Sequence, residues 1–165
     1  MLPSVGDFAV TLSPRGIFIA QAPRPWHGRL VADAPTIART WFDEAEADLH
    51  AAEVSLAGAA YNWACFQAQQ AGEKALKALL YARGRTSIIT HSLRRLLTEA
   101  ERIEPELGKL KRAAKLLDDH YIPTRYPNGL DEETAPSRYY TREDANECLQ
   151  CARSILERVR TSFAS

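Results

Sequence analysis

The sequence has few cysteines, no long apolar run and no excess of charge of either sign. Its three cysteines, Cys65, Cys148 and Cys151, do not form a disulfide framework in a chain of 165 residues. No apolar run approaches the roughly 20 residues of a membrane span, and the N-terminus lacks the basic and apolar regions of a signal peptide. Lys+Arg and Asp+Glu both number 21, so the overall charge predicts neither nucleic acid nor membrane as partner. These absences predict a reduced, cytoplasmic protein without a membrane segment.

Length and composition are those of one soluble globular domain. At 165 residues the chain is long enough to bury a single core. Apolar residues make up 45% of the chain and charged residues 25%, which are ordinary values for this class. Residues 83–125 hold ten basic and six acidic residues, whereas residues 36–57 hold one basic and five acidic residues. A basic middle region and an acidic first helix would produce an electrostatic field that steers an anion toward the basic region. Mixed surface charge without such a role is the commoner explanation.

Residues 1–34 differ in composition from the rest and are predicted to be an N-terminal extension. Two short apolar runs flank Ser13-Pro14-Arg15-Gly16. Proline followed by glycine at this spacing suits a tight turn, so the pattern is compatible with a small β-hairpin. The stretch APRPWHG follows and is too rich in proline for regular structure. Three interpretations stay open: an arm that packs on the body or on a partner, a disordered leader, and a start codon assigned too early.

From Asp33 onward the apolar pattern is helical and predicts a second region over residues 35–165. Asp33 suits an N-cap and Pro35 a first turn, where the missing N–H of proline costs nothing. The last helix begins at Thr141, which forms a capping-box pattern with Asp144. The predicted helices span about residues 35–58, 60–83, 90–104, 105–120 and 141–163. Five helices with short connections and little strand signal predict an all-α fold, an antiparallel bundle.

Two short groups of metal-ligating or thiol residues are interpreted as structural. Cys148-x-x-Cys151 lies inside the last helix, away from the helix N-terminus, where the dipole would activate a thiol. No second cysteine or histidine pair has the spacing of a zinc site. Asp118-Asp119-His120 offers three ligand groups, but neighbouring side chains on a helix point apart. The sequence therefore predicts no metal and no cofactor, and it leaves a nucleotide as the small ligand to consider.

The helix predicted over residues 60–83 carries a polar stripe in which Lys74 and Lys77 are candidate ligand-binding residues. The stripe follows i, i+3, i+4 spacing, and Glu73 and Lys77 are placed to pair with each other. One interpretation is a solvated helix face. The other is a stripe that faces a groove, where both ammonium groups would be available to a phosphate.

A group consisting of Arg85 and His91 is a second candidate for phosphate chemistry. The two residues are six positions apart. An arginine and a histidine together can bind a phosphate and transfer a proton, as RNA cleavage requires. The spacing alone is weak evidence, because His91 can equally lie in the first turn of the third helix without any such role.

The stretch HYIPTRYPNG, which follows the fourth predicted helix, is the most unusual in the sequence. Pro123 and Pro127 fix two φ angles and disfavour helix in the residues before them, so the chain is expected to run extended here. Arg125 lies between these two stiffened points, where its guanidinium can be aimed at little entropic cost. Tyr121 and Tyr126 either stack on a base or pack on the bundle. In the structural interpretation, the stretch is an aromatic corner in which Arg125 bonds helix carbonyls or an acidic residue.

Three stretches of the sequence together resemble the HEPN domain family. They are AYNWACFQAQQAGEKALKALLYARG (60–84), HSLRRLL beginning at His91, and RYPNG beginning at Arg125. The resemblance covers about residues 36–160 and leaves the N-terminal extension outside. It implies a compact helical bundle that is often a homodimer. Many such proteins in bacteria and archaea are encoded beside a minimal nucleotidyltransferase, with which they form a toxin–antitoxin module.

In several branches of the HEPN family the domain is a metal-independent ribonuclease. Its motif is an arginine, four to six residues and then a histidine, near the start of a late helix at a dimer cleft. Here no histidine follows Arg125, His120 precedes it, and the Arg85/His91 pair lies between the second and third predicted helices. Ribonuclease activity therefore does not carry over by motif. This RYP-containing branch resembles the non-catalytic or uncertain members of the family.

The first of three hypotheses is a binding module. It would hold a nucleotide, RNA or the partner transferase in a dimer groove near Lys77, Arg125 and Tyr126, and Lys74 and Tyr121 are the further ligand-binding candidates. The family resemblance also suggests that the partner transferase modifies Tyr121 or Tyr126.

The second hypothesis is a ribonuclease toxin that uses Arg125 with His120 or His91. The arginine would stabilise the charged phosphorane-like state, and a histidine would move the proton of the 2′-OH. The third hypothesis is a non-catalytic structural subunit of a transferase complex.

Overall fold

The computed structural model describes residues 12–13, 16–17, 33–130 and 134–164. Its contacts divide the chain into two units, residues 1–31 and 32–165. In the first unit, strands β1 (Leu12–Ser13) and β2 (Gly16–Ile17) pair antiparallel, with Leu12 opposite Ile17. This pairing agrees with the predicted hairpin. The predicted turn between the strands and the rest of the predicted arm lie outside the described residues.

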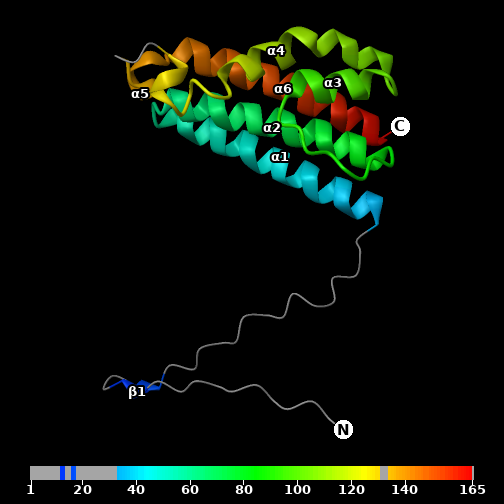
Figure 1. The fold of residues 1–165 in the computed structure, drawn as a ribbon, viewed down its shortest axis with the longest axis horizontal. Helices are drawn as coiled ribbons and strands as arrows, with labels where there is room; N and C mark the ends of the chain where they lie inside the picture. Colours follow the sequence, from blue (N-terminus) through cyan, green and yellow to red (C-terminus); the bar gives the residue numbers. More distant parts are fainter. Residues whose placement is uncertain (1–11, 14–15, 18–32, 131–133, 165) are drawn as a thin grey trace. The chain divides into compact units, whose positions relative to one another are not determined.

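The second unit is a helical bundle built around one central helix (Figure 1). Its long helices are α1 (Ala34–Ala57), α2 (Tyr61–Ala82) and α6 (Arg142–Ala164). The shorter helical segments are α3 (Leu93–Glu101), η1 (Pro105–Leu110), α4 (Lys111–His120), η2 (Pro127–Gly129) and α5 (Pro136–Tyr139). Helix α2 packs on α1, α3, α4, α5 and α6. The predicted all-α antiparallel bundle is confirmed.

Local sequence signals account for the starts of α1, α3 and α6. Asp33 caps α1 by accepting a hydrogen bond from the Thr36 N–H at 3.0 Å. The predicted capping box of α6 is reciprocal: the Thr141 N–H donates to Asp144 at 2.8 Å, and the Asp144 N–H donates to the Thr141 hydroxyl at 3.2 Å. Helix α3 begins later than predicted because Ser92 is its N-cap. These caps satisfy N–H groups that the first helical turn leaves unpaired.

The fourth predicted helix is two elements. Residues 105–110 form the 3₁₀ turn η1, and α4 begins only at Lys111. Gly108 within this segment accounts for the tighter first part, since glycine is a poor former of an α-helix interior. The predicted segment therefore has the right position and length, but its first part is a 3₁₀-helix and only its second part is an α-helix.

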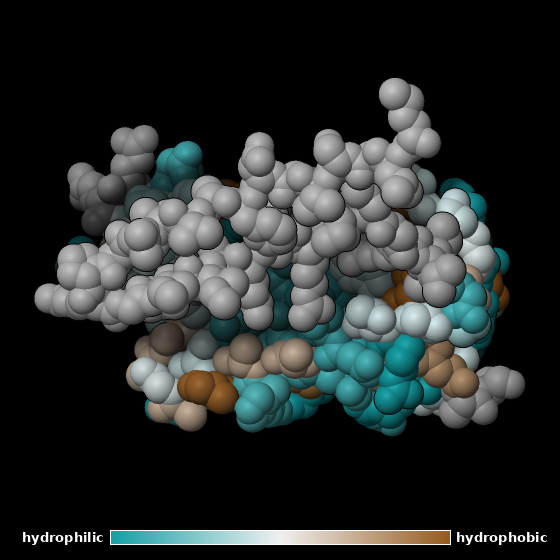
Figure 2. All heavy atoms as spheres, turned by 90° about the horizontal axis from the view of Figure 1, so that it is seen from below, coloured by the Kyte–Doolittle hydropathy of each residue, from teal (hydrophilic) through white to brown (hydrophobic). Residues whose placement is uncertain are grey.

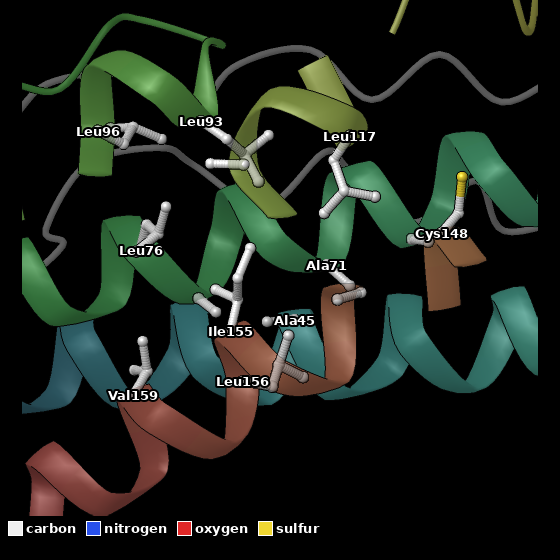
Figure 3. Close-up of a cluster of buried hydrophobic side chains, with 14 of the residues drawn as sticks. Ala45, Ala71, Leu76, Leu93, Leu96, Leu117, Cys148, Ile155, Leu156 and Val159 are labelled. Atoms are coloured by element: carbon white, nitrogen blue, oxygen red, sulfur yellow. The ribbon is translucent and has the colours of Figure 1, made fainter. Parts of the chain in front are cut away.

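The core lies where α2 meets the helices around it (Figure 3). Helix α2 contributes a row of fully buried small residues, and α1, α3, α4 and α6 close over it with leucine, isoleucine, valine and alanine. Short side chains on α2 let these helices approach closely, so one helix can be buried on several faces. Figure 3 shows the labelled side chains Leu93, Leu117 and Ile155 converging on this helix.

The visible surface of the helical unit is mainly polar. On the face in Figure 2, hydrophilic residues cover most of the visible described part, and hydrophobic residues form separate small patches. None of the described helices combines the length and the apolar character needed to cross a membrane.

Candidate functional site

The segment after α4 is a compact turn that is tied to the central helix. The Thr124 hydroxyl donates to the His120 carbonyl at 2.8 Å, and the Tyr126 N–H donates to the Ile122 carbonyl at 3.2 Å. The buried Asn62 amide of α2 donates to the Thr124 carbonyl at 3.0 Å. The predicted extended run is therefore wrong for most of the segment, because its backbone groups pair locally. Tyr126 is extended, with φ −125° and ψ 125°.

Arg125 lies among three aromatic rings. Its Cζ is 4.5 Å from the ring centroids of Phe66 and Tyr121 and 5.1 Å from that of Tyr126. Its Nε and Nη2 donate to the Tyr121 carbonyl at 3.1 and 2.9 Å. Among the described residues, Nη1 has no hydrogen-bond partner. We call Phe66, Tyr121, Arg125 and Tyr126 the Arg125 cluster. Its arginine makes the predicted bond to a backbone carbonyl and still has a donor to offer.

His91 extends the Arg125 cluster on another side. Its ring stacks on Tyr121 with centroids 6.2 Å apart and an interplanar angle of 9°. Its Nδ1 is 3.0 Å from Oε1 of Glu73, and 61% of the side chain is exposed. The structure thus joins His91 to Arg125 through one tyrosine ring, although the two residues are far apart in the sequence. An exposed imidazole, a guanidinium and aromatic faces meet on one surface.

His120 points into a different environment. Its Nδ1 is 3.1 Å from the Tyr140 hydroxyl, and the two rings meet edge to face. Burial lowers the pKa of His120, which favours the neutral imidazole. Its ring thus contacts Tyr140, whereas its backbone carbonyl supports the turn before Arg125. The catalytic roles considered for His120, His91 and Arg125 stay predictions.

Both lysines of the polar stripe have carboxylate partners. The Lys77 ammonium lies 2.8 Å from Oε1 of Glu73 and 5.2 Å from the Trp41 ring centroid, and 5% of the side chain is exposed. Lys74 lies 2.7 Å from a carboxylate oxygen of Asp48. Lys77 is thus buried, so the stripe is not a uniformly solvated face. The ligand-binding roles of both lysines stay predictions.

Comparisons with known proteins identify the family of this chain. The HEPN domain family matches residues 38–162. The chain belongs to the HEPN domain family. A curated protein of Methanocaldococcus jannaschii, named "Putative toxin MJ1304", is 32% identical over 130 residues, which are 74% of this chain and 86% of that protein.

Solved structures of similar proteins share the bundle. TT1696 from Thermus thermophilus is 45% identical with a TM-score of 0.68, and the match covers 75% of this chain and 96% of that one. The archaeal HEPN homologue ST0689 is 39% identical with a TM-score of 0.64, covering 76% and 96%. The HEPN domain protein tm0613 from Thermotoga maritima is 28% identical with a TM-score of 0.60, covering 76% and 98%.

The cysteine and acidic residues considered as thiol or metal sites contribute to the packing and helix capping of this HEPN domain. Cys148 is buried, and a hydrogen bond with Cys65 together with burial raises the pKa of its thiol, so it stays protonated. The Asp118 carboxylate accepts from the Ser92 hydroxyl and the Leu93 N–H, both at 2.7 Å, at the start of α3. Among the described residues no three His, Cys, Asp or Glu side chains form a group that could hold a metal ion.

Sequence reasoning missed two members of this candidate site. Phe66 was not singled out, yet its half-buried ring faces Arg125. Glu73 was recognised only as a pairing partner of Lys77, yet it also contacts His91. The sequence signal for Glu73 was its position one helical turn before Lys77, which showed the ion pair but not the contact with His91. Nothing local could show that the connector between α2 and α3 returns to this carboxylate.

Proposed function

We propose that this HEPN domain is the toxin-type component of a two-protein module and binds single-stranded RNA at the Arg125 cluster. The observation that carries the proposal is the guanidinium of Arg125 held among three aromatic rings, with Tyr126 half exposed. Unpaired RNA bases stack on aromatic side chains and on guanidinium planes, and a cation attracts the phosphates. The printed name of the M. jannaschii relative supports the toxin-type role.

The family resemblance adds partners to this proposal. We include a homodimer, in which the cluster would lie beside a groove, and a minimal nucleotidyltransferase as the second component of the module. A free nucleotide offers the same base and phosphate groups as RNA, so it is the alternative ligand for the same surface. Lys74 and Lys77 would then act on a ligand only after exchange of their carboxylate partners.

Replacing Arg125 with alanine is expected to weaken RNA binding about tenfold or more. Loss of a stacked contact to a base costs about 1–3 kcal/mol, and 1.4 kcal/mol is a factor of ten in affinity. Fluorescence polarisation with a labelled, unstructured RNA oligonucleotide measures the change. Arg112→Ala is the matched control, because this exposed arginine lies 3.6 Å from Glu147 on the α4–α6 side of the bundle.

A second pair of variants tests the aromatic part of the same surface. Tyr126 and Tyr139 are 50% and 52% exposed, so their alanine variants remove equally exposed rings. Only Tyr126→Ala should weaken RNA binding. Equal affinities for Arg125→Ala and Arg112→Ala, in variants that melt as the wild type does, would contradict the proposed site.

An endoribonuclease is a second candidate function, favoured by the contact of His91 and Arg125 with one tyrosine ring. In this reaction the imidazole of His91 takes the proton of a 2′-OH while the O2′–P bond forms. The P–O5′ bond breaks, and the leaving 5′-oxygen takes a proton from water. The hydroxide that remains takes the proton from the His91 imidazolium, which regenerates the neutral imidazole. Arg125 stabilises the added negative charge on the phosphoryl oxygens. The products are a 2′,3′-cyclic phosphate and a 5′-hydroxyl end.

Replacing His91 with alanine is expected to slow RNA cleavage about a hundredfold and to leave RNA affinity within twofold. A positioned general base contributes about 10²–10⁴ in rate. Single-turnover cleavage of the oligonucleotide measures the rate, and growth arrest on expression provides a cellular readout. His50→Ala, which removes an exposed imidazole from α1, is the control. Wild-type protein that binds RNA but leaves it intact would eliminate this candidate and leave the binding proposal standing.

A further inference from the structure

A buried carboxylate of the central helix contacts the exposed imidazole of the candidate site. We infer that Glu73 is a positioning residue that holds His91 with its proton on Nδ1 and leaves Nε2 as the proton acceptor. The statement about the proton follows from the contacts below. The use of Nε2 on RNA rests on the ribonuclease function proposed above.

The partners of Glu73 fix its protonation state. Oε1 accepts from the Lys77 ammonium at 2.8 Å, and Oε2 accepts from the Gln69 amide nitrogen at 3.3 Å. The same Gln69 nitrogen donates to the His91 carbonyl, while its oxygen accepts from Gln70, so the orientation of the amide is set. Lysine ammonium and amide N–H groups only donate. Both oxygens of Glu73 therefore accept, and the group is a carboxylate.

The tautomer of His91 follows from that assignment. An ionised carboxylate has no proton to give, so Nδ1 of His91 must donate to Oε1 across their 3.0 Å contact. In the neutral imidazole, Nε2 then carries a lone pair. Among the described residues Nε2 has no hydrogen-bond partner. With most of the side chain exposed, this nitrogen is the one that a bound molecule can reach.

The neighbouring elements hold the ring and its backbone in place. Tyr121 stacks on the imidazole from the segment after α4. The adjacent Ser92 hydroxyl donates to Asp118 of α4 at 2.7 Å, which anchors the start of α3 next to His91. The charged and titratable groups on the elements next to the imidazole include Glu73 and Lys77 from α2, Arg94 from α3, Asp118 from α4, and Tyr121 and Arg125 from the turn.

This arrangement suits proton removal from a ribose hydroxyl. When Nε2 takes the 2′-OH proton, the imidazole becomes a cation whose Nδ1–H already faces a carboxylate. A carboxylate oriented in this way stabilises the imidazolium and preserves the required tautomer. Lys77 keeps that carboxylate ionised from the buried side, so it is expected to act through Glu73 and not on the substrate.

The tautomer can be measured without any assumption about RNA. In protein labelled with ¹⁵N-histidine, at about pH 8.5 where free imidazole is neutral, His91 of the wild type should show the Nδ1–H form. Glu73→Leu, which offers no acceptor oxygen, should lose this single form, whereas Glu157→Leu, an exposed α6 variant, should keep it. If Glu73→Leu does not fold, the wild-type spectrum still decides. An Nε2–H form in the wild type, or an Nδ1–H form that persists in Glu73→Leu, overturns the inference.

Kinetics distinguish positioning from simple structural support. In folded Glu73→Gln, kcat for RNA cleavage should fall about tenfold or more with KM unchanged, because the substrate does not touch Glu73. A rise in KM with unchanged kcat would overturn the role. Wild-type protein that shows the Nδ1–H form but cleaves no RNA would overturn the ribonuclease function while supporting the orienting contact, so the two failures are distinguishable.

Discussion

Replacing Lys77 with methionine is expected to lower the free energy of unfolding by about 3–5 kcal/mol. The Lys77 ammonium and the Glu73 carboxylate lie 2.8 Å apart, with 5% and 4% of their side chains exposed. Methionine keeps most of the packing against Trp41 but removes the cation, so a buried carboxylate loses its charged partner. Chemical denaturation followed by circular dichroism measures the loss.

A double variant separates the lost pairing from lost packing. Glu73→Gln in the Lys77→Met background should recover part of the stability, because replacing both members of a buried ion pair also removes their desolvation cost. The exposed pair of Lys115 and Asp119 provides the matched control, since it has the same i, i+4 spacing at the surface. Lys115→Met should cost less than about 1 kcal/mol. An equally small cost for Lys77→Met would contradict a buried ion pair.

The parts of the fold that depend on local sequence could be predicted. Asp33 with Pro35 marked the start of α1, and Thr141 with Asp144 marked the start of α6, because an N-cap satisfies N–H groups only a few residues away. Helical periodicity placed the long helices for the same reason, since the repeat is contained in the segment itself. The order of the five predicted helical segments then followed, whereas the short segments η2 and α5 were not predicted.

The turn after α4 could not be predicted from its prolines. Proline restricts the residue before it, but it does not decide whether the chain extends or folds back. The buried bond between Asn62 and the Thr124 carbonyl and the bond from the Thr124 hydroxyl to His120 decide it here. The first of these bonds joins residues 62 positions apart, and such pairing leaves no trace in a short window.

The candidate site was only partly visible for a related reason. Arg125 and Tyr121 could be singled out because they lie near each other in an unusual stretch, whereas His91 reaches them only through the packing of α3 on the central helix. An i, i+4 pair such as Glu73 and Lys77 has the same spacing on a buried and on an exposed helix face. Burial of this pair depends on neighbours such as Trp41 on α1, which pattern analysis of α2 cannot include.

Replacing Leu93 with alanine is expected to cost about 2–5 kcal/mol of unfolding free energy. Leu93 is the first residue of α3, is fully buried, and lies in the core against α2 (Figure 3). Its Cδ2 would be 2.8 Å from a Cβ placed on Gly72, and Leu117 and Ile155 are also close to that position. Removing the isobutyl group therefore leaves a cavity beside the glycine, which urea denaturation of the variant detects as lost stability.

The glycine makes this prediction specific to one contact. In the wild type, Gly72→Ala should be destabilising by about 1–3 kcal/mol from overpacking, offset in part by the better helix propensity of alanine. In the Leu93→Ala background the added methyl enters the cavity, so the same change should cost at least about 0.5 kcal/mol less. Leu149 is a buried α6 residue that is not among the nearest neighbours of Gly72. In the Leu149→Ala background, Gly72→Ala should therefore lower the free energy of unfolding by the same amount as in the wild type. If the losses of unfolding free energy for Leu93→Ala and Gly72→Ala were strictly additive, Leu93 at the start of α3 would not pack against Gly72. A different contact would then have to fix the start of α3 and, with it, the position of His91.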